Sequence, residues 1–349
     1  MDIKDFLVEA SEATGASGYE VQVASIFQRY IEPLADEVQI DALGNAIAIR
    51  QGANSNGPKI MLAGHMDEIA LVITKIEPGG FLRFTQIGGI DQRTLLGQEV
   101  VVHGRLPLVG VIGAKPPHIQ KPEERKQAVP MDKLFIDVGL DAATVSEQVS
   151  VGDIATISRQ VVELAGDTLS GKAFDDRAGV ATILACFQEL TRLKTAATVY
   201  GVATVQEEVG TRGAQTAAYR IQPDIGIGID VTFADRGDLL EERAVLGKGP
   251  VIGIGPHVHP KVFQRMVEIA GERGIAYQID PSPSPYGTDT APIQVSRTGV
   301  ASILISLPLR YMHTSVETLH LQDVKAAGRL LAEFIASIDA DFVEGLKCY

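Results

Sequence analysis

The sequence predicts an α/β fold, a mixed sheet flanked by helices, into which a small β domain is inserted. After residue 175, amphipathic helical segments alternate with apolar strand-like runs, as in a sheet with helices packed on it. From about residue 67 to 162, short β-type runs are separated by Gly, Pro and Asp, as in a small barrel or sandwich. We therefore expect residues 1–66 and 163–349 to form one discontinuous α/β domain, and residues 67–162 to form an inserted β domain.

The first 66 residues predict the opening helices and strands of the α/β domain. Apolar residues recur at helical spacing over 3–14 and 18–34, and Gly15 and Gly18 interrupt the pattern between them. The runs EVQID, NAIAIR and KIMLAGH then predict strands at 37–41, 45–50 and 59–65.

After residue 175 the expected elements alternate. Helical spacing is found over 176–193, about 211–220, 261–274 and 321–339. Apolar runs predict strands over 198–206, 224–231 and 301–306. In an open α/β sheet, ligands bind at the carboxyl ends of such strands.

Composition and charge narrow the classes of function. Of 349 residues, 45% are hydrophobic and 21% are charged, as in an ordinary soluble globular protein. The net charge of −13 argues against nucleic acid or an anionic membrane as the main partner, because both attract clustered Lys and Arg. No apolar run approaches the ~18–20 residues of a membrane span, and the N-terminus has no signal-peptide pattern. Because Cys186 and Cys348 are the only cysteines, we expect a reducing, cytoplasmic location.

Polar residues that could carry chemistry lie at the ends of the apolar strands. They are His65, Asp67, Asp175, Asp176, Glu207, Glu208, Asp230 and His313. Two histidines and several carboxylates at successive strand ends suit Zn²⁺, Co²⁺ or Mn²⁺. Asp67 is spaced to accept a hydrogen bond from the ring of a metal-bound His65. One of the aspartates at 175 and 176 could bridge two metals.

The adjacent glutamates of TVQEEVGTRG, Glu207 and Glu208, raise a separate question. Two neighbouring carboxylates repel each other, and neighbouring residues of a strand point to opposite sides. A cation would remove the repulsion and leave one glutamate as a ligand and the other as a free base. Two metals beside a free carboxylate can activate a water molecule against an amide.

Each of these features alone has a simpler interpretation. An isolated pair of glutamates is usually a solvated strand end that caps the next helix, and Asp175–Asp176 could be an ordinary helix cap. His257 and His259 resemble a metal pair, but the prolines around them favour a loop that leads into a helix. The joint occurrence of the carboxylates and histidines at strand ends favours a metal site.

Five motifs in this order, GHMDE, AFDDRAG, QEEVGTRGA, GIDVT and RYMHTSVE, resemble those of the tetrahedral (TET) aminopeptidases. These dinuclear metallopeptidases include glutamyl and deblocking aminopeptidases, and the resemblance covers nearly the whole chain. It implies two divalent metal ions per subunit, Zn²⁺, Co²⁺ or Mn²⁺. One ion would be held by His65, Asp175 and Asp230, and the other by Asp175, Glu208 and His313.

The resemblance also implies the remaining roles at the site and the assembly. Glu207 would be the general base, Asp67 would orient His65, and the peptide bond between Asp175 and Asp176 would be cis. The β insertion would be PDZ-like and make a dimer contact, with six dimers forming a hollow dodecamer. Substrates would be peptides with a free N-terminus, from which N-terminal residues are hydrolysed.

The preferred N-terminal residue of the substrate does not follow from these motifs. Arg236, Arg243 and Lys248 are candidates to bind an acidic side chain, from their proximity to the fourth motif in the sequence. The segments 231–249 and 281–290 are expected to form walls of the pocket.

Three alternatives fit parts of the pattern. Carboxypeptidases and acyl-amino-acid deacylases share the metal scaffold but usually carry a different lid domain, so the β insertion and the DDR tripeptide favour an aminopeptidase. A glycoside hydrolase could use a carboxylate pair, but its chemistry leaves the histidines without a role. A non-catalytic assembly protein would be expected to lack a ligand or the base, and none is missing.

Overall fold

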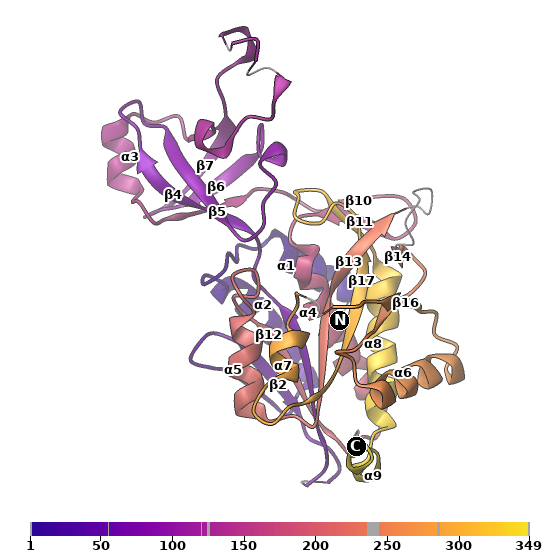
Figure 1. The fold of residues 1–349 in the computed structure, drawn as a ribbon. Coiled ribbons are helices and arrows are strands. Elements are labelled where there is room, and N and C mark those ends of the chain that lie inside the picture. Colours follow the sequence, from indigo (N-terminus) through magenta and orange to yellow (C-terminus); the bar gives the residue numbers. More distant parts are fainter. Residues whose placement is uncertain are drawn as a thin grey trace.

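The computed structural model describes residues 2–347 with the exception of 55, 120, 124–125, 236–243 and 285–286. Two units stand apart in Figure 1: a large α/β part, and a β-barrel connected to it at one end. The predicted fold class is confirmed, because the chain forms a mixed sheet with helices and a closed antiparallel barrel.

The α/β part is built on a sheet with the strand order β1-β2-β12-β3-β13-β17-β15-β16, and β14 pairs with β13. The strands are β1 (Glu37–Ile40), β2 (Ala46–Arg50), β3 (Lys59–His65), β12 (Thr198–Thr204), β13 (Ile225–Asp235), β14 (Ala244–Val245), β15 (Val251–Ile254), β16 (Gln278–Pro281) and β17 (Ala301–Leu309). The four central strands β12, β3, β13 and β17 are parallel. Their carboxyl ends therefore lie at the same edge of the sheet.

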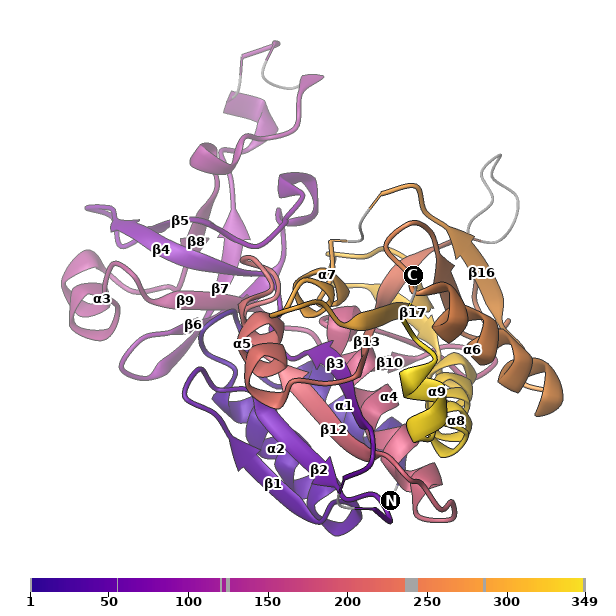
Figure 2. The same cartoon turned by 60° about the horizontal axis from the view of Figure 1, so that its bottom comes forward.

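Helices cover both faces of this sheet, as Figure 2 shows. On one face α4 packs against β3 and β13 and is itself covered by α1, α2 and α8, with α6 against α8. On the other face α5 contacts β12 and β3, and α7 contacts β13 and β17. The helices are α1 (Ile3–Glu12), α2 (Val21–Ile31), α4 (Phe174–Leu190), α5 (Arg212–Ile221), α6 (Pro260–Glu272), α7 (Thr290–Gln294), α8 (Leu321–Ala336) and α9 (Ala340–Glu344). Because α4 is covered on nearly all sides, its sequence is apolar all round rather than amphipathic.

The barrel closes in the order β4-β5-β8-β7-β6-β9, and every pairing in it is antiparallel. Its elements are β4 (Ala70–Ile76), β5 (Leu82–Ile87), β6 (Glu99–His103), β7 (Pro107–Gly113), β8 (Phe135–Asp137), α3 (Ala142–Gln148) and β9 (Ile154–Ile157). Alternate side chains of these strands point inward and form an apolar core separate from that of the sheet. A closed barrel leaves no exposed strand edge.

The remaining elements are short, and the sequence patterns did not predict them. A small sheet joins β10 (Val162–Glu163), β11 (Thr168–Gly171) and β18 (Glu317–His320). Single turns of 3-10 helix are η1 (Glu32–Leu34), η2 (Gln92–Thr94), η3 (Pro117–Ile119) and η5 (Met131–Lys133). Strands of two to four residues are too short to show a period of hydrophobicity, which explains why β15 and β16 were also missed.

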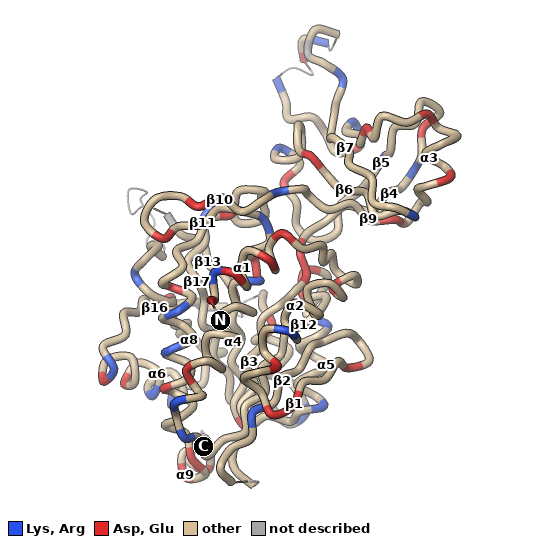
Figure 3. Tube along the Cα trace, turned by 180° about the vertical axis from the view of Figure 1, so that it is seen from behind, with Lys and Arg blue, Asp and Glu red and all other residues tan. Residues whose placement is uncertain are grey.

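Among the described residues, no helix is long and apolar enough to span a membrane. Acidic and basic residues are interspersed along the trace of both the α/β part and the barrel in Figure 3.

Candidate metal centre

A cavity of about 630 Å³ opens at the carboxyl ends of the parallel strands. Six of the residues proposed from the sequence line it: His65, Asp175, Glu207, Glu208, Asp230 and His313. They come from five separate segments of the chain, and the parallel order of β3, β12, β13 and β17 brings those segments together. This is the position at which open α/β sheets bind ligands.

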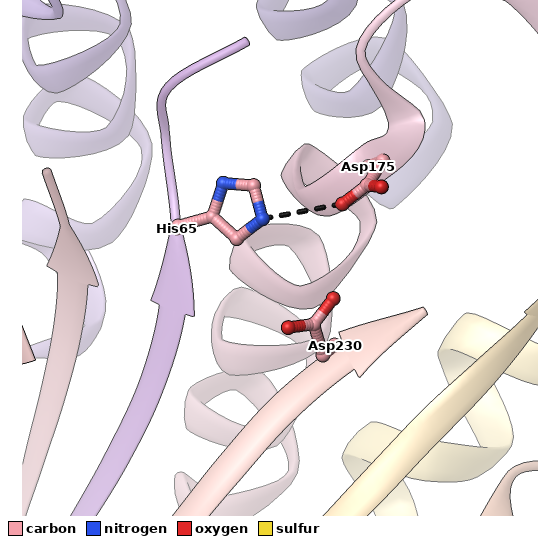
Figure 4. Close-up of side chains that lie close together, drawn as sticks. All are labelled: His65, Asp175 and Asp230. Carbon is pink, nitrogen blue, oxygen red and sulfur yellow. Dashed lines mark hydrogen bonds and ion pairs between the residues drawn. The ribbon is translucent and has the colours of Figure 1, made fainter. Parts of the chain in front are cut away.

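His65, Asp175 and Asp230 point toward one another from three different elements (Figure 4). His65 is the last residue of β3, Asp175 lies in the first turn of α4, and Asp230 lies within β13. Nε2 of His65 lies 3.2 Å from Oδ1 of Asp175. One ligand atom from each of the three residues lies within 4.8 Å of the others, so the three could hold one metal ion.

Asp175, Glu208 and His313 form a second group of the same kind. Nε2 of His313 lies 3.2 Å from Oδ2 of Asp175 and 3.2 Å from Oε1 of Glu208. The two carboxylate oxygens of Asp175 therefore face the two histidines separately. This arrangement fits a carboxylate that bridges two metal ions.

Buried charge supports the same assignment. Burial and the neighbouring Asp175 raise the pKa of Asp230 to about 8. Hydrogen bonds to Asp175 and Glu208 raise the pKa of His313 to about 11. Burial opposes ionisation of Asp175, but hydrogen bonds from His313 and His65 outweigh it and hold its pKa below the usual range. Carboxylates crowded in this way need positive charge nearby, and two histidines with three carboxylates match the ligands of zinc and similar cations.

Glu207 lies in the same cavity but belongs to neither group of ligands. Its Oε2 is 3.9 Å from Nε2 of His65. Burial, followed by the repulsion of Asp230 among others, raises the pKa of Glu207 to about 9. The structure thus gives the two adjacent glutamates different surroundings, because Glu208 contacts His313 and Glu207 faces the open cavity beside His65.

Asp67 lies next to the ring of His65. Nδ1 of His65 is 3.1 Å from the main-chain oxygen of Asp67 and 3.5 Å from its carboxylate Oδ1. The carboxylate also accepts hydrogen bonds from the backbone N–H of Glu207 at 2.9 Å and of Glu208 at 3.1 Å. Ser17 donates to it as well, at 2.6 Å. Asp67 therefore holds the loop of the glutamates as well as the imidazole.

In the segment 205–208, the backbone N–H of every residue donates a hydrogen bond to a side chain. The N–H of Val205 donates to Asn45 and the N–H of Gln206 donates to Glu20, at 3.1 Å and 3.0 Å. Gln206 has a left-handed backbone with φ of 57°, a conformation that a residue with a side chain adopts at a cost. The chain turns at this residue, and the turn allows Glu207 and Glu208 to face the same cavity.

Asp176 stabilises the junction between β3 and α4. Its carboxylate accepts hydrogen bonds from the N–H of Gly179 at 3.0 Å and from the N–H of His65 at 3.1 Å. The peptide bond between Asp175 and Asp176 is cis, as the resemblance implied. A Cβ on Gly179 would lie 2.2 Å from Oδ2 of Asp176, so only glycine fits beside this carboxylate.

A buried ion cluster beneath the site was missed by the sequence analysis. Glu68 accepts from Lys172 at 2.6 Å and from Arg177 at 3.1 Å, and all three side chains are buried. Arg177 also donates to main-chain oxygens of the segment that follows α1, including that of Ala13 at 2.7 Å. The cluster joins the N-terminal segment, the start of α4 and the residues that lead into the barrel. The arginine of the DDR motif was the one available signal for it.

The other histidines lie outside both ligand groups. His257 and His259 precede α6, with Pro260 as the first helical residue, which confirms a loop that leads into a helix. His103 lies in the barrel strand β6, where its ring is 2.9 Å from the hydroxyl of Thr156. His320 precedes α8 and accepts from the N–H of Gln322.

The suggested walls of the pocket are placed in part. Phe233 and Thr288 line the cavity, and Asp280, just outside the second suggested segment, lines it too. Of the candidate cations, Arg236 and Arg243 lie outside the described residues. Lys248 is exposed and does not line the cavity.

The chain is similar to known peptidases over nearly its whole length. The family profile described as M42 glutamyl aminopeptidase matches residues 44–330. A lysyl aminopeptidase of Pyrococcus furiosus is 37% identical over 92% of this chain and 94% of its own. The crystal structure of a TET aminopeptidase from the marine sediment archaeon Thaumarchaeota archaeon SCGC AB-539-E09 superimposes with a TM-score of 0.93, at 35% identity and 99% of each chain. The TET1 peptidase of Pyrococcus horikoshii, described as assembling into a tetrahedron or a large octahedral shell, gives 0.84 at 32% identity, over 97% of this chain and 100% of that one.

Proposed function

Because the chain belongs to the M42 glutamyl aminopeptidase family and is a metallo-aminopeptidase, we propose that it removes N-terminal residues from peptides at a two-metal centre. His65, Asp175 and Asp230 hold one ion, and Asp175, Glu208 and His313 hold the other. The observation that carries the proposal is the pair of ligand groups that share Asp175 beside a carboxylate that belongs to neither. The donor set suits Zn²⁺, Co²⁺ or Mn²⁺.

The cations would supply a Lewis acid for the scissile carbonyl and lower the pKa of a water molecule. Glu207 acts as the general base that accepts the proton of the attacking water and then passes it to the leaving amine. Asp67 accepts a hydrogen bond from the backbone N–H of Glu207, and this bond fixes the position of the Glu207 backbone.

We infer that the substrates are peptides with a free N-terminus, because the curated relatives that cover nearly the whole chain are described as aminopeptidases. The relatives include enzymes described as lysyl and as glutamyl aminopeptidases. The preferred N-terminal residue of the substrate can be determined with a panel of aminoacyl-nitroanilides, assayed with several metals.

The direct test is removal and return of metal. Dialysis against a chelator should abolish hydrolysis of a free-amine peptide, and added Zn²⁺ or Co²⁺ should restore it, because the ligand groups bind metal only in their deprotonated forms. An N-acylated copy of the same peptide serves as the control and should not be cleaved. Full turnover after metal content has been shown to be nil would contradict the two-metal mechanism.

We also infer that the barrel is a PDZ-like dimerisation domain and that the subunits assemble from dimers into a dodecamer. Val109 and Val111, both within β7, are 70% and 48% exposed, and their spacing of two residues puts them on the same face of the strand. Apolar residues gathered on one surface are typical of a contact with another subunit. A solved structure of the relative PhTET1 is described as a dodecamer.

Light scattering coupled to size-exclusion chromatography tests this assembly. The wild type should elute with the mass of twelve chains, and a variant in which residues 70–160 are replaced by a short linker should be much smaller but folded. A monomeric wild type would contradict the inference.

A further inference from the structure

One buried carboxylate is bonded to the main chain of two candidate ligands at once. Glu317 lies in β18, and its side chain is 2% exposed. Its Oε2 accepts a hydrogen bond from the backbone N–H of Asp175 at 3.1 Å. Its Oε1 accepts one from the backbone N–H of His313 at 2.9 Å. Each oxygen therefore holds a different ligand of the second group.

His313 needs such a restraint because of its backbone. It lies in the loop between β17 and β18, which is closed by a pair of main-chain hydrogen bonds between Arg310 and Thr318. Tyr311 and His313 both have left-handed backbones, with φ of 59° and 60°. Residues with side chains adopt this conformation at a cost and keep it where surrounding contacts fix it.

The backbone of Asp175 also requires a contact that fixes its conformation. It lies in the first turn of α4 with a non-helical backbone, φ −78° and ψ 105°. The N–H groups of a first helical turn have no partner within the helix, and Glu317 supplies one here. Two ligands that are 138 residues apart in the sequence (313 − 175) are thereby tied to one side chain.

We propose that Glu317 is a positioning residue of the second metal site, where it fixes the distance between Asp175 and His313. The proposal rests on the two-metal function above, since it concerns the affinity of one of those two sites. Glu317 itself does not belong to either ligand group. It acts through the backbones of the residues that do.

Two substitutions separate geometry from charge. Glu317→Gln keeps the shape but places an amide NH₂ opposite one of the two N–H groups, so one hydrogen bond is lost. Glu317→Asp keeps the charge but is one methylene too short to reach both N–H groups. If Glu317 acts by position, both variants bind the second metal more weakly.

Asp323→Asn is the matched control. Asp323 is also a buried carboxylate that accepts from two backbone N–H groups, those of Gly247 at 2.7 Å and Gly249 at 2.8 Å. It does not line the cavity. Its substitution removes the same kind of bond at another place in the fold.

The experiment is a titration of the chelator-treated full-length chain with Co²⁺, followed by calorimetry and by the visible absorption of the bound ion. Wild type should take up two equivalents. In both Glu317 variants the second equivalent should bind about 10–100-fold more weakly, the usual effect of losing a hydrogen-bond partner of a metal ligand. The first should weaken less, because two of its three ligands, His65 and Asp230, are not held by Glu317, and Asp323→Asn should bind both ions as wild type does.

The possible failures are distinguishable. If wild type took up fewer than two ions, the two-metal function itself would be wrong. If wild type bound two ions and both Glu317 variants did so with unchanged affinity, only the role of Glu317 would be wrong. Equal weakening of both sites, together with a lower melting temperature of the metal-free variant, would show a general structural role and overturn the proposal. Unchanged binding in Glu317→Asp alone would show that charge, rather than position, matters.

Discussion

The α/β part and the barrel differ most in what they bury. Among the described residues, the buried polar and charged side chains lie in the α/β part with one exception in the barrel, Thr156. The barrel core is formed by aliphatic residues and Phe84. In the α/β part, by contrast, whole ionic groups are buried, among them Asp175, Asp230 and the cluster of Glu68, Lys172 and Arg177.

Burial of charge costs free energy, and a fold keeps buried charges where they are paired or serve function. The difference therefore indicates that the α/β part carries the chemistry and that the barrel serves as a stable module. It follows that substitutions in the α/β site should change metal binding and turnover, whereas substitutions in the barrel should change stability or assembly.

The largest expected effect is in the pair of glutamates. Glu207→Gln leaves both ligand groups intact but cannot accept a proton, so turnover should fall by about 10²–10⁴-fold with two metals still bound. Glu208→Gln removes a charged ligand, so the metal content should fall from two ions towards one, with partial recovery of activity at high metal concentration. Metal analysis beside steady-state kinetics makes the comparison. Loss of a metal in Glu207→Gln alone would mean that the roles are exchanged.

A barrel substitution of comparable energetic size should leave the chemistry unchanged. Ile136 is fully buried in the barrel core, so Ile136→Ala should lower the free energy of unfolding by about 2–5 kcal/mol. Denaturant unfolding measures this loss, and kcat is measured on the same preparation at a temperature where it remains folded. A large fall in kcat of the folded variant would contradict the separation of roles between the two parts.

The stability of the metal-free protein should depend on pH in an unusual direction. The pKa of Glu207 is raised to about 9 and that of Asp230 to about 8, against about 4 for both in an unfolded chain. Between pH ~4 and these raised pKa values, the two carboxyl groups keep their protons in the folded state but have lost them in the unfolded state. The free energy of unfolding therefore falls as the pH rises. The pKa of His313 is raised to about 11. Above the pKa of ~6.5 that histidine has in an unfolded chain, this group also makes stability fall as the pH rises.

Melting temperatures measured in chelator should therefore be lower at pH 8 than at pH 5. Saturating Zn²⁺ should remove the decline, because bound metal stabilises the ionised carboxylates and adds free energy by mass action. A melting temperature of the chelated protein that rises from pH 5 to pH 8 would show that these groups are not protonated in the folded state.

The smallest effect on the subunit itself is expected at the surface of the barrel. Val109 is exposed on β7, so Val109→Lys should change the free energy of unfolding of one subunit by no more than about 0.5 kcal/mol. It should nevertheless weaken assembly, because a charge would be buried in the proposed contact. Analytical ultracentrifugation would detect the smaller species, and Lys126→Ala, at an exposed residue of the same part, is a control for charge at the surface.

Much of the site could be predicted from the sequence because it depends on local patterns. The apolar runs predicted β3, β12 and β13, and the polar residues at or near their carboxyl ends became the candidate ligands. The predicted and observed bounds of these strands differ by a few residues. For example, β13 runs to Asp235 rather than to 231. The proposed division of these ligands into two groups came from the resemblance, and the structure brings the members of each group close together.

The tertiary structure alone decided how those ligands are held. Glu20 and Asn45 accept hydrogen bonds from the loop that carries the glutamates, across 186 and 160 residues of sequence. Glu317 reaches Asp175 across 142 residues. Nothing in a local pattern marks a carboxylate for such a contact, because hydrogen bonds to a distant backbone depend on how the strands and helices pack. The sequence determined which residues could bind metal, and packing determined the acceptors that hold the ligand loops in place.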